Sequence, residues 1–305
     1  MAQPTLLDIA KSTGSDGIAA LIEEIALAIP EVRLGAARTI KGTQYKATVR
    51  TGLPTGGFRG ANEGVTPQKS TFEQRLFECY IANARWQCDK AVADAHEDGA
   101  QAYIAAEAKG VIQGQLIALA SQFYYGVADD TNKGFPGLGV AYDSTNMAVN
   151  ATGTTNNVAS SVWMIKWGEE GVQWLYGNGS NPLQLDDLRI ESVLDSNSKP
   201  YTAYVQELLA WVGLKLGSVN SALRIKNITT DSGKGLTDSL IYDGFSKFPA
   251  GVKPDVILMT RRSLAQLRKS RTATNQTGAP APIPTEVEGV PIEVTDSIVN
   301  TEALA

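Results

Sequence analysis

EDGAQAYIAAEAKGVIQGQLIALASQFYY, residues 97–125, is the longest uninterrupted helical pattern in the chain. Its apolar residues recur at steps of three and four, which places them on one face of a helix. They are Ile104, Ala108, Val111, Ile112, Leu116, Leu119 and Phe123. A helix of this length reaches roughly 40 Å. Because glutamines are spread through it, we expect a mostly covered helix that serves as the strut of the fold, not a membrane span.

Gly110 and Gly114 lie four residues apart on this predicted helix. One interpretation is that they permit close approach by the backbone of another element. The other is that they are simply tolerated, since a glycine inside a helix costs only ~1 kcal/mol relative to alanine. The sequence leaves both interpretations open.

The bulk composition is that of an ordinary globular protein, with 43% hydrophobic and 19% charged residues. A chain of 305 residues is long enough for two subdomains. The net charge of −5 argues against a protein that wraps nucleic acid, because phosphate contacts require clustered lysines and arginines. The N-terminus shows no secretory signal pattern, and Cys79 and Cys88 fit neither a disulfide framework nor a metal site. A reducing cytoplasm fits these features best.

The N-terminal part of the chain has the pattern of an arm. Residues 15–29 predict a short amphipathic helix that ends before Pro30. The preceding residues carry only a weak apolar stripe, so we expect an arm that must lie on another surface.

Residues 38–53 and 71–86 are both typical of strands, and residues 54–67 between them carry four glycines and two prolines. The two segments predict a hairpin with strands of roughly 50 Å. Neither strand has a clean apolar face, and an isolated two-stranded ribbon is only marginally stable in water. Such a ribbon should need a partner subunit. The alternative is an ordinary pair of edge strands on a mixed sheet.

A β-rich region follows the long helix. A short strand is predicted near residues 147–149, and residues 162–167 and 172–176 predict a β-hairpin. Residues 187–195 and 201–216 predict a second strand pair, although the latter segment also has partly helical character. Large aromatic side chains in strands usually fill a core; those of this region are Trp163, Trp167, Trp174 and Trp211.

The final third predicts helices at residues 235–249 and 261–271, and strands at residues 254–260 and 289–296. We interpret this region as a small helix-flanked sheet that forms a second subdomain. The whole chain is then of the α+β class.

No catalytic constellation emerges. His96 is the only histidine, so any Ser-His-Asp triad would have to use it, and a helix start or a solvated turn explains its position better. The glycine-rich segment at residues 229–238 is not a phosphate-binding P-loop, because Lys234 is followed by Gly235 and not by Ser or Thr. We therefore expect no enzyme, no cofactor and no metal site.

One basic cluster is present, in residues 261–271. It fits either an acidic surface of a neighbouring subunit or nucleic acid, and a solvated helix face is the simplest explanation. Its members are Arg261, Arg262, Arg268, Lys269 and Arg271.

The order of these parts resembles that of the major capsid proteins of tailed double-stranded DNA phages, which share the Hong Kong 97-type capsid fold, and among them a short podovirus-like form. The resemblance covers essentially the whole chain. It is most specific in LPTGGFRGANEGVTPQKSTFEQRLFECYIANARWQCDKAVAD (residues 53–94), PDVILMTRRSLAQLRKSRTATNQTGAPAP (residues 254–282) and GVPIEVTDS (residues 289–297).

The resemblance implies a Hong Kong 97-like division of the chain. Residues 1–37 would be the N-terminal arm, and residues 38–92 the extended E-loop hairpin, which lies over a neighbouring subunit. Residues 93–230 would be the P-domain, with its spine helix at residues 97–126, and residues 231–305 the A-domain and C-terminal segment.

The resemblance also implies inter-subunit contacts at the hairpin tip, on the basic helix and in the loop at residues 272–285. The candidate assembly residues are Gly56, Gly57, Phe58, Arg59, Arg261, Arg262, Arg268, Arg271, Asn275 and Gln276. We expect no covalent Lys–Asn crosslink.

The implied function is a structural shell protein whose hexamers and pentamers form an icosahedral capsid. The capsid would enclose double-stranded DNA without sequence-specific binding. The expected partners are further copies of the chain, a separate scaffolding protein and a portal, with a decoration protein left open. The expected location is the virion, after assembly in the bacterial cytoplasm. Two alternatives stay open: the shell of an encapsulin-like compartment, and an enzyme with a lid hairpin.

Overall fold

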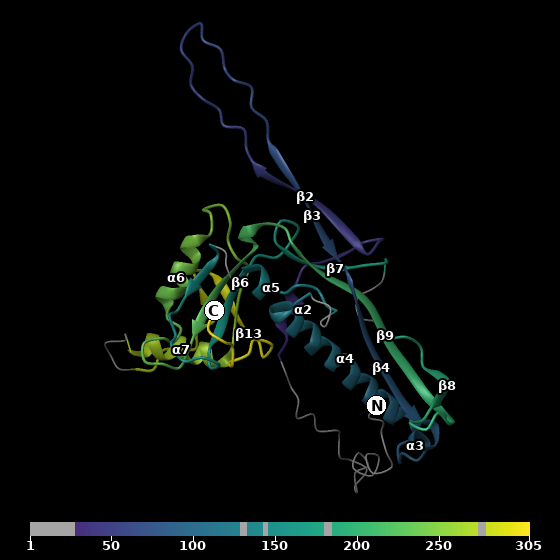
Figure 1. The fold of residues 1–305 in the computed structure, drawn as a ribbon. Helices are drawn as coiled ribbons and strands as arrows, with labels where there is room; N and C mark the ends of the chain where they lie inside the picture. The colour runs from purple at the N-terminus through teal and green to yellow at the C-terminus, as the bar shows by residue number, and fades with distance from the viewer. Residues whose placement is uncertain (1–27, 129–132, 143–145, 180–184, 274–278) are drawn as a thin grey trace.

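The computed structural model describes residues 28–128, 133–142, 146–179, 185–273 and 279–305. It consists of two β-sheets, one long helix and a two-stranded ribbon that projects from the body (Figure 1). Most of the predicted arm, including most of the helix at residues 15–29, lies outside the described residues. The first described helix, α2 (Pro30–Leu34), begins at the proline where we expected a helix to end. Proline suits this position because the first helical residue needs no N–H donor.

The long helix is confirmed as α4 (Ala100–Tyr125), which follows the short helix α3 (Lys90–Asp94). It begins after Gly99, whose φ of 85° suits a residue without a side chain. Its fully buried residues lie near its two ends: Tyr103, Ile104, Leu119, Ala120, Phe123 and Tyr124. Between residues 105 and 118 no side chain is fully buried, so the helix is less covered in this single chain than we expected.

The first sheet has the order β1-β7-β9-β4, and β8 pairs with β9. Its strands are β1 (Ala37–Thr39), β4 (Tyr80–Asp89), β7 (Val172–Tyr176), β8 (Arg189–Leu194) and β9 (Pro200–Leu216). The predicted pairing of the last two strands is confirmed, and β9 is extended throughout, so its helical alternative was wrong. Helix α4 packs against β4 and β9 (Figure 1).

The second sheet has the order β12-β13-β11-β6-β10-β5. Its strands are β5 (Ala148–Asn150), β6 (Ser160–Ile165), β10 (Ala222–Ile228), β11 (Val256–Met259), β12 (Glu286–Val287) and β13 (Val290–Val294). The associated helices are α5 (Leu138–Tyr142), α6 (Asp238–Lys247) and α7 (Arg261–Ala273), and a 3-10 turn, η1 (Val219–Ser221), precedes β10. The predicted elements of the final third are all present. They do not form a sheet of their own, however, because β11 pairs with β6.

The predicted hairpin at residues 162–167 and 172–176 was wrong. Strand β6 belongs to the second sheet and β7 to the first, and only an isolated bridge between Trp167 and Val172 joins the two segments. Every residue of both strands is buried. A strand that is covered on both faces can be central in either of two layers, so its hydrophobic pattern does not identify its partner.

The C-terminal end of α4 connects the cores of the two sheets. The ring of Phe123 lies 5.2 Å from that of Trp174 on β7, and the ring of Tyr124 lies 6.1 Å from that of Trp163 on β6. Both tryptophans are 1% exposed, which confirms that they fill the core. The long helix therefore holds the two sheets together.

The ribbon comprises residues 44–78, with strands β2 (Gln44–Gly52) and β3 (Thr71–Glu78). The two strands pair from Gln44 opposite Glu78 to Gly52 opposite Thr71. The predicted hairpin is too long, because after Glu78 the chain enters β4, an edge strand beside β9. The interpretation as an isolated ribbon therefore holds for β2 and β3, and the interpretation as an edge strand of a sheet holds for β4.

The change from ribbon to sheet depends on Gly213 of β9. A Cβ atom at this position would lie 2.4 Å from the carbonyl oxygen of Glu78. Gly213→Ala should therefore lower the free energy of unfolding by about 1–3 kcal/mol through overpacking. Gly110→Ala is the matched control: a Cβ there meets no atom within 4 Å, and alanine is the better helix former by ~1 kcal/mol. Urea unfolding of both variants checks the opposite signs, and equal effects would contradict this account of the junction.

Candidate assembly surfaces

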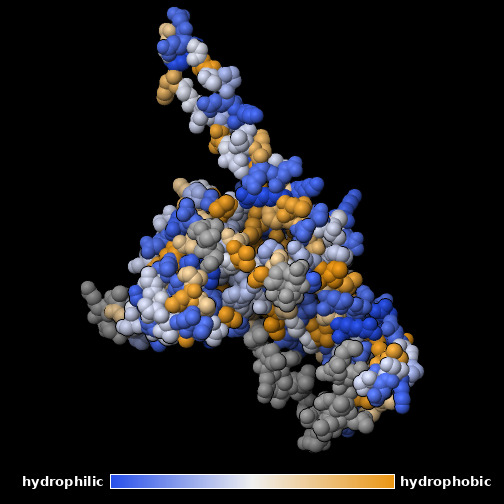
Figure 2. All heavy atoms as spheres, in the orientation of Figure 1, coloured by the Kyte–Doolittle hydropathy of each residue, from blue (hydrophilic) through white to orange (hydrophobic). Residues whose placement is uncertain are grey.

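The ribbon exposes apolar side chains along its whole length. Figure 2 shows it standing clear of the body, with hydrophobic residues spread among polar ones. The exposed apolar residues are Leu53 (71% exposed), Phe58 (112%), Val65 (62%), Phe72 (59%) and Leu76 (49%). Monomeric proteins seldom present a projecting apolar surface without a partner for it.

The ribbon tip, residues 53–70, makes its described side-chain hydrogen bonds within itself. The amide N and the Oγ1 of Thr55 each donate to Oε1 of Gln68 at 2.7 Å. Arg59 donates to the carbonyl oxygen of Glu63 at 2.6 Å. The four predicted tip residues, Gly56, Gly57, Phe58 and Arg59, are thus brought together on an exposed loop.

The root of the ribbon is anchored to the first sheet by cation–π contacts. Arg38 lies 4.9 Å from the centroid of the Tyr45 ring, and Lys215 Nζ lies 5.1 Å from the same centroid. Arg38 also forms an ion pair with Glu169 at 2.9 Å. Burial lowers the pKa of Lys215, whose Nζ donates to the carbonyl oxygen of Glu169. The root is fixed, whereas the tip makes no side-chain hydrogen bond to the described residues of the body.

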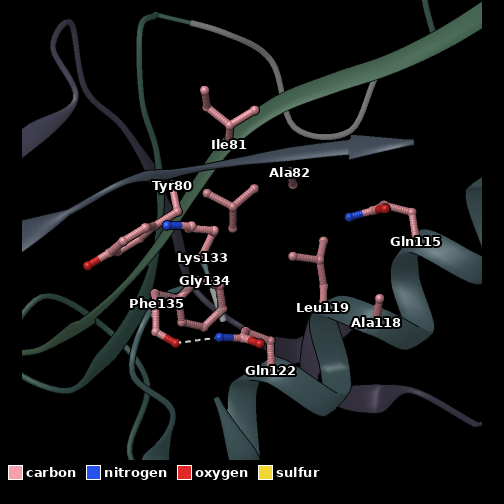
Figure 3. Close-up of a pocket in the computed structure, with 11 residues that line it drawn as sticks. Tyr80, Ile81, Ala82, Gln115, Ala118, Leu119, Gln122, Lys133, Gly134 and Phe135 are labelled. Carbon is pink, nitrogen blue, oxygen red and sulfur yellow. Dashed lines mark hydrogen bonds between the residues drawn. The ribbon is translucent and has the colours of Figure 1, made fainter. Parts of the chain in front are cut away.

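A pocket of about 230 Å³ lies beside the root, between α4 and β4 (Figure 3). We call it the root pocket. Its lining comes from β4, β9, α4 and the segment before α5, and consists of Tyr80, Ile81, Ala82, Gln115, Ala118, Leu119, Gln122, Lys133, Gly134, Phe135 and Val212. Nε2 of Gln122 donates to the carbonyl oxygen of Phe135 at 2.7 Å, which ties the last of these segments to the helix. The pocket could not be predicted from the sequence, because the segments that line it are far apart along the chain.

The basic cluster on α7 is mostly engaged within the subunit. Arg271 makes two hydrogen bonds to the carboxylate of Asp238, at 2.6 and 2.8 Å. Arg262 donates to the carbonyl oxygens of Val158, Ile228 and Asn300, and Arg268 donates to that of Ala281. Arg261 is exposed. Asn275 and Gln276 lie outside the described residues.

The C-terminal segment is held by a buried ionic network that sequence reasoning missed. Arg224 pairs with Glu302 at 3.2 Å, and the two side chains are 9% and 5% exposed. Glu302 also accepts hydrogen bonds from Tyr125 of α4 and Ser161 of β6, each at 2.5 Å. The network joins the long helix, the second sheet and the C-terminal segment.

His96 and the glycine-rich loop, which the sequence analysis considered as possible catalytic or phosphate-binding groups, make local hydrogen bonds that stabilise the fold. Nδ1 of His96 accepts a hydrogen bond from the amide of Asp98 at 3.2 Å in a turn. Asp231 of the glycine-rich loop accepts bonds from Thr154, Thr155 and Thr229, and these bonds hold its pKa well below the usual range. No set of three His, Cys, Asp or Glu side chains in the described residues is arranged to hold a metal ion. None of the described helices is both long and apolar enough to cross a membrane.

The described residues combine a projecting ribbon with no recognisable catalytic or metal site, and comparison with protein families accounts for this combination. A family model described as major capsid protein GP7 matches residues 34–305. The chain belongs to this family. As a major capsid protein it is a structural component of a capsid shell, it acts as an oligomer, and it is located in the virion.

Solved structures agree on the fold of this capsid protein. A chain from bacteriophage Epsilon15 is 24% identical with a TM-score of 0.74, and the match covers 100% of this chain and 98% of that chain. A chain of the cyanophage A-1(L) capsid is 12% identical with a TM-score of 0.51, and the match covers 71% of this chain and 97% of that chain. The predicted α+β, Hong Kong 97-like capsid fold is thereby confirmed. The SrpI encapsulin of Synechococcus elongatus PCC 7942 is more distant, at 10% identity and a TM-score of 0.47 over 76% of this chain and 98% of that chain. The curated proteins contain no match.

Proposed function

We propose that copies of this capsid protein assemble as hexamers and pentamers into a closed icosahedral shell that encloses packaged double-stranded DNA. The observation that carries the proposal is the ribbon, because its apolar side chains remain exposed beside the described part of their own chain. A two-stranded ribbon of this kind gains stability only when another element packs on it. In a shell that element is a neighbouring copy.

We also propose that the chain is divided into an E-loop, a P-domain and an A-domain, as the resemblance implies. The ribbon would act as the E-loop, α4 as the spine helix of the P-domain, and α6, α7 and the end of the second sheet as the A-domain. Arg261 and Arg268 are exposed on α7 and would face a neighbouring subunit, while Nε of Arg268 also donates to the carbonyl oxygen of Ala281. Arg262 and Arg271 act within the subunit through the contacts described above.

DNA is proposed as the content of the shell, without sequence-specific recognition. The net charge of −5 supports enclosure more than tight binding, because a strongly basic wall would hold phosphates directly. The protein would assemble in the bacterial cytoplasm with a separate scaffolding protein and a portal, and with a decoration protein as a further option. It would have no enzymatic activity.

Nuclease protection tests the proposed content. Particles formed by coexpression with the neighbouring phage genes should retain double-stranded DNA after nuclease treatment of the intact particles. Particles that contain only protein cargo would contradict the proposal and favour a compartment of the encapsulin kind. A long processed precursor, detected by intact mass spectrometry, would contradict the separate scaffolding protein.

A further inference from the structure

We propose that the phenyl ring of Phe58 in one copy occupies the root pocket of a neighbouring copy. The proposal rests on the proposed function, that is, on assembly through the ribbon. It goes further by naming the anchor residue, the pocket that receives it and the direction of the contact.

The root pocket has the size and chemistry of a phenyl site. An apolar cavity of about 150 Å³ is known to hold benzene, so a pocket of about 230 Å³ can take a phenyl ring. Leu119 and Phe135 of its lining are buried, whereas Ile81 is 57% exposed at its edge. In Figure 3 Tyr80, Leu119 and Phe135 line the pocket, the side chain of Lys133 lies between Tyr80 and Phe135, and the amide of Gln122 is turned to the Phe135 carbonyl. Most of the lining is apolar, and Gln115, Gln122 and Lys133 are its polar and charged members.

Phe58 has the properties of an interface anchor. It is the most exposed large apolar side chain in the described residues, at 112%. Gly56 and Gly57 precede it and have no side chains, so the chain beside the ring is narrow. The space around both glycines is open, since a Cβ atom at either would meet nothing within 4 Å. Aromatic side chains that insert into preformed pockets carry a large share of the energy of protein interfaces.

The ribbon cannot deliver Phe58 to the pocket of its own chain. Tyr80, Ile81 and Ala82 of the pocket directly follow the root of the ribbon. Phe58 is separated from the root by β2 and part of the tip, which at ~3.3 Å per residue span up to roughly 45 Å. Figure 1 shows the ribbon directed away from the body. The ring that fills a root pocket must therefore come from another copy.

A contact from tip to root joins two different surfaces of the same chain. Such a heterologous contact leaves one free tip and one free pocket on each dimer, so it continues until a ring closes. It can therefore be repeated around a hexamer or a pentamer.

Disulfide trapping between two differently labelled chains tests the contact. One chain carries Gly57→Cys with Phe58 retained, and the other carries Ala118→Cys on the helix side of the root pocket. The native cysteines give little background, because Cys79 and Cys88 are buried and burial raises the pKa of each thiol to about 11. In mixed shells under mild oxidation we expect covalent dimers that contain one chain of each kind. A single chain with both substitutions should give a ladder up to pentamers and hexamers.

Two matched variants make the test specific. Adding Phe58→Ala to the first chain should reduce the dimer yield about tenfold or more, as expected when a buried aromatic anchor is truncated. Adding Leu53→Ala, which truncates another exposed apolar side chain of the tip, should leave it unchanged. Moving the second cysteine to Ala102, an exposed residue of α4 outside the pocket, should abolish the dimer.

The outcomes separate the inference from the proposed function. Shells that form normally but give no more Gly57→Cys/Ala118→Cys dimer than the Ala102 control would overturn the Phe58 contact and leave the capsid function standing. Equal dimer yields with and without Phe58→Ala would also overturn it. Failure of the unsubstituted chain to assemble under any condition would instead contradict the proposed function.

Discussion

A chain that lacks residues 56–66 is expected to fold normally and to form no stable shells. The deletion joins Thr55 to Pro67 and keeps the Thr55–Gln68 hydrogen bonds that close the base of the tip. The tip makes no described side-chain hydrogen bond to the body, so the free energy of unfolding of the subunit should change by less than about 0.5 kcal/mol. Assembly should nevertheless fail, because the apolar anchor of the ribbon is gone. Sedimentation velocity and thermal unfolding measure the two effects separately.

A second variant distinguishes the tip side chains from the length of the loop. Replacing residues 56–66 by eleven Gly and Ser residues preserves the length and removes Phe58, Arg59 and Val65. We expect this variant to fail in assembly as the deletion does. Normal particles from either variant would count against the ribbon as the inter-subunit element.

Glu302→Ala is expected to destabilise the subunit by about 3–5 kcal/mol, because it removes the buried carboxylate that pairs with the guanidinium of Arg224. The hydrogen bonds that Tyr125 and Ser161 donate to Glu302 are lost as well. The C-terminal segment should then detach from the second sheet. Chemical unfolding of the purified subunit measures the loss, and hydrogen exchange of β6 and β10 should increase.

Two controls show whether charge burial is the cause. Glu286→Ala removes an exposed carboxylate and should change stability by less than about 0.5 kcal/mol. The double variant Arg224→Met/Glu302→Leu should recover most of the loss, since a buried ion pair is often replaced by apolar residues at little cost. A Glu302→Ala protein as stable as the Glu286→Ala protein would contradict the role of the network.

The elements that the sequence predicts well are those with a local cause. Helix α4 follows from a long repeat of apolar residues, and α6 and α7 follow from shorter ones. The pairing of strands β8 and β9 was predicted correctly, because a short turn at residues 195–199 connects them directly. Local periodicity and turn chemistry decide these cases.

The errors have a non-local cause. Strands β6 and β7 are adjacent in sequence and have similar patterns, but their partners β10 and β9 lie far along the chain. The end of the ribbon at Glu78 depends on Gly213, which has no side chain at the crossing point. Neither fact is contained in the hydrophobic pattern of the segments involved.

The candidate assembly surfaces also include one part that could be predicted from the sequence and two that could not. The composition of residues 54–67 predicts only a glycine-rich tip between two strands, and the contact role of residues 56–59 comes from the resemblance to capsid proteins. The exposure of Phe58 agrees with that interpretation. The root pocket and the Arg224–Glu302 pair could not be predicted, because each requires the tertiary contacts of segments from different parts of the chain.

The most direct test of the account is sedimentation followed by negative-stain electron microscopy of the unmodified chain, expressed alone and together with its neighbouring genes. We expect closed particles, or fragments of curved shell, in which each subunit extends its ribbon over a neighbour. A monomer or small oligomer under every condition, including coexpression, would contradict the account.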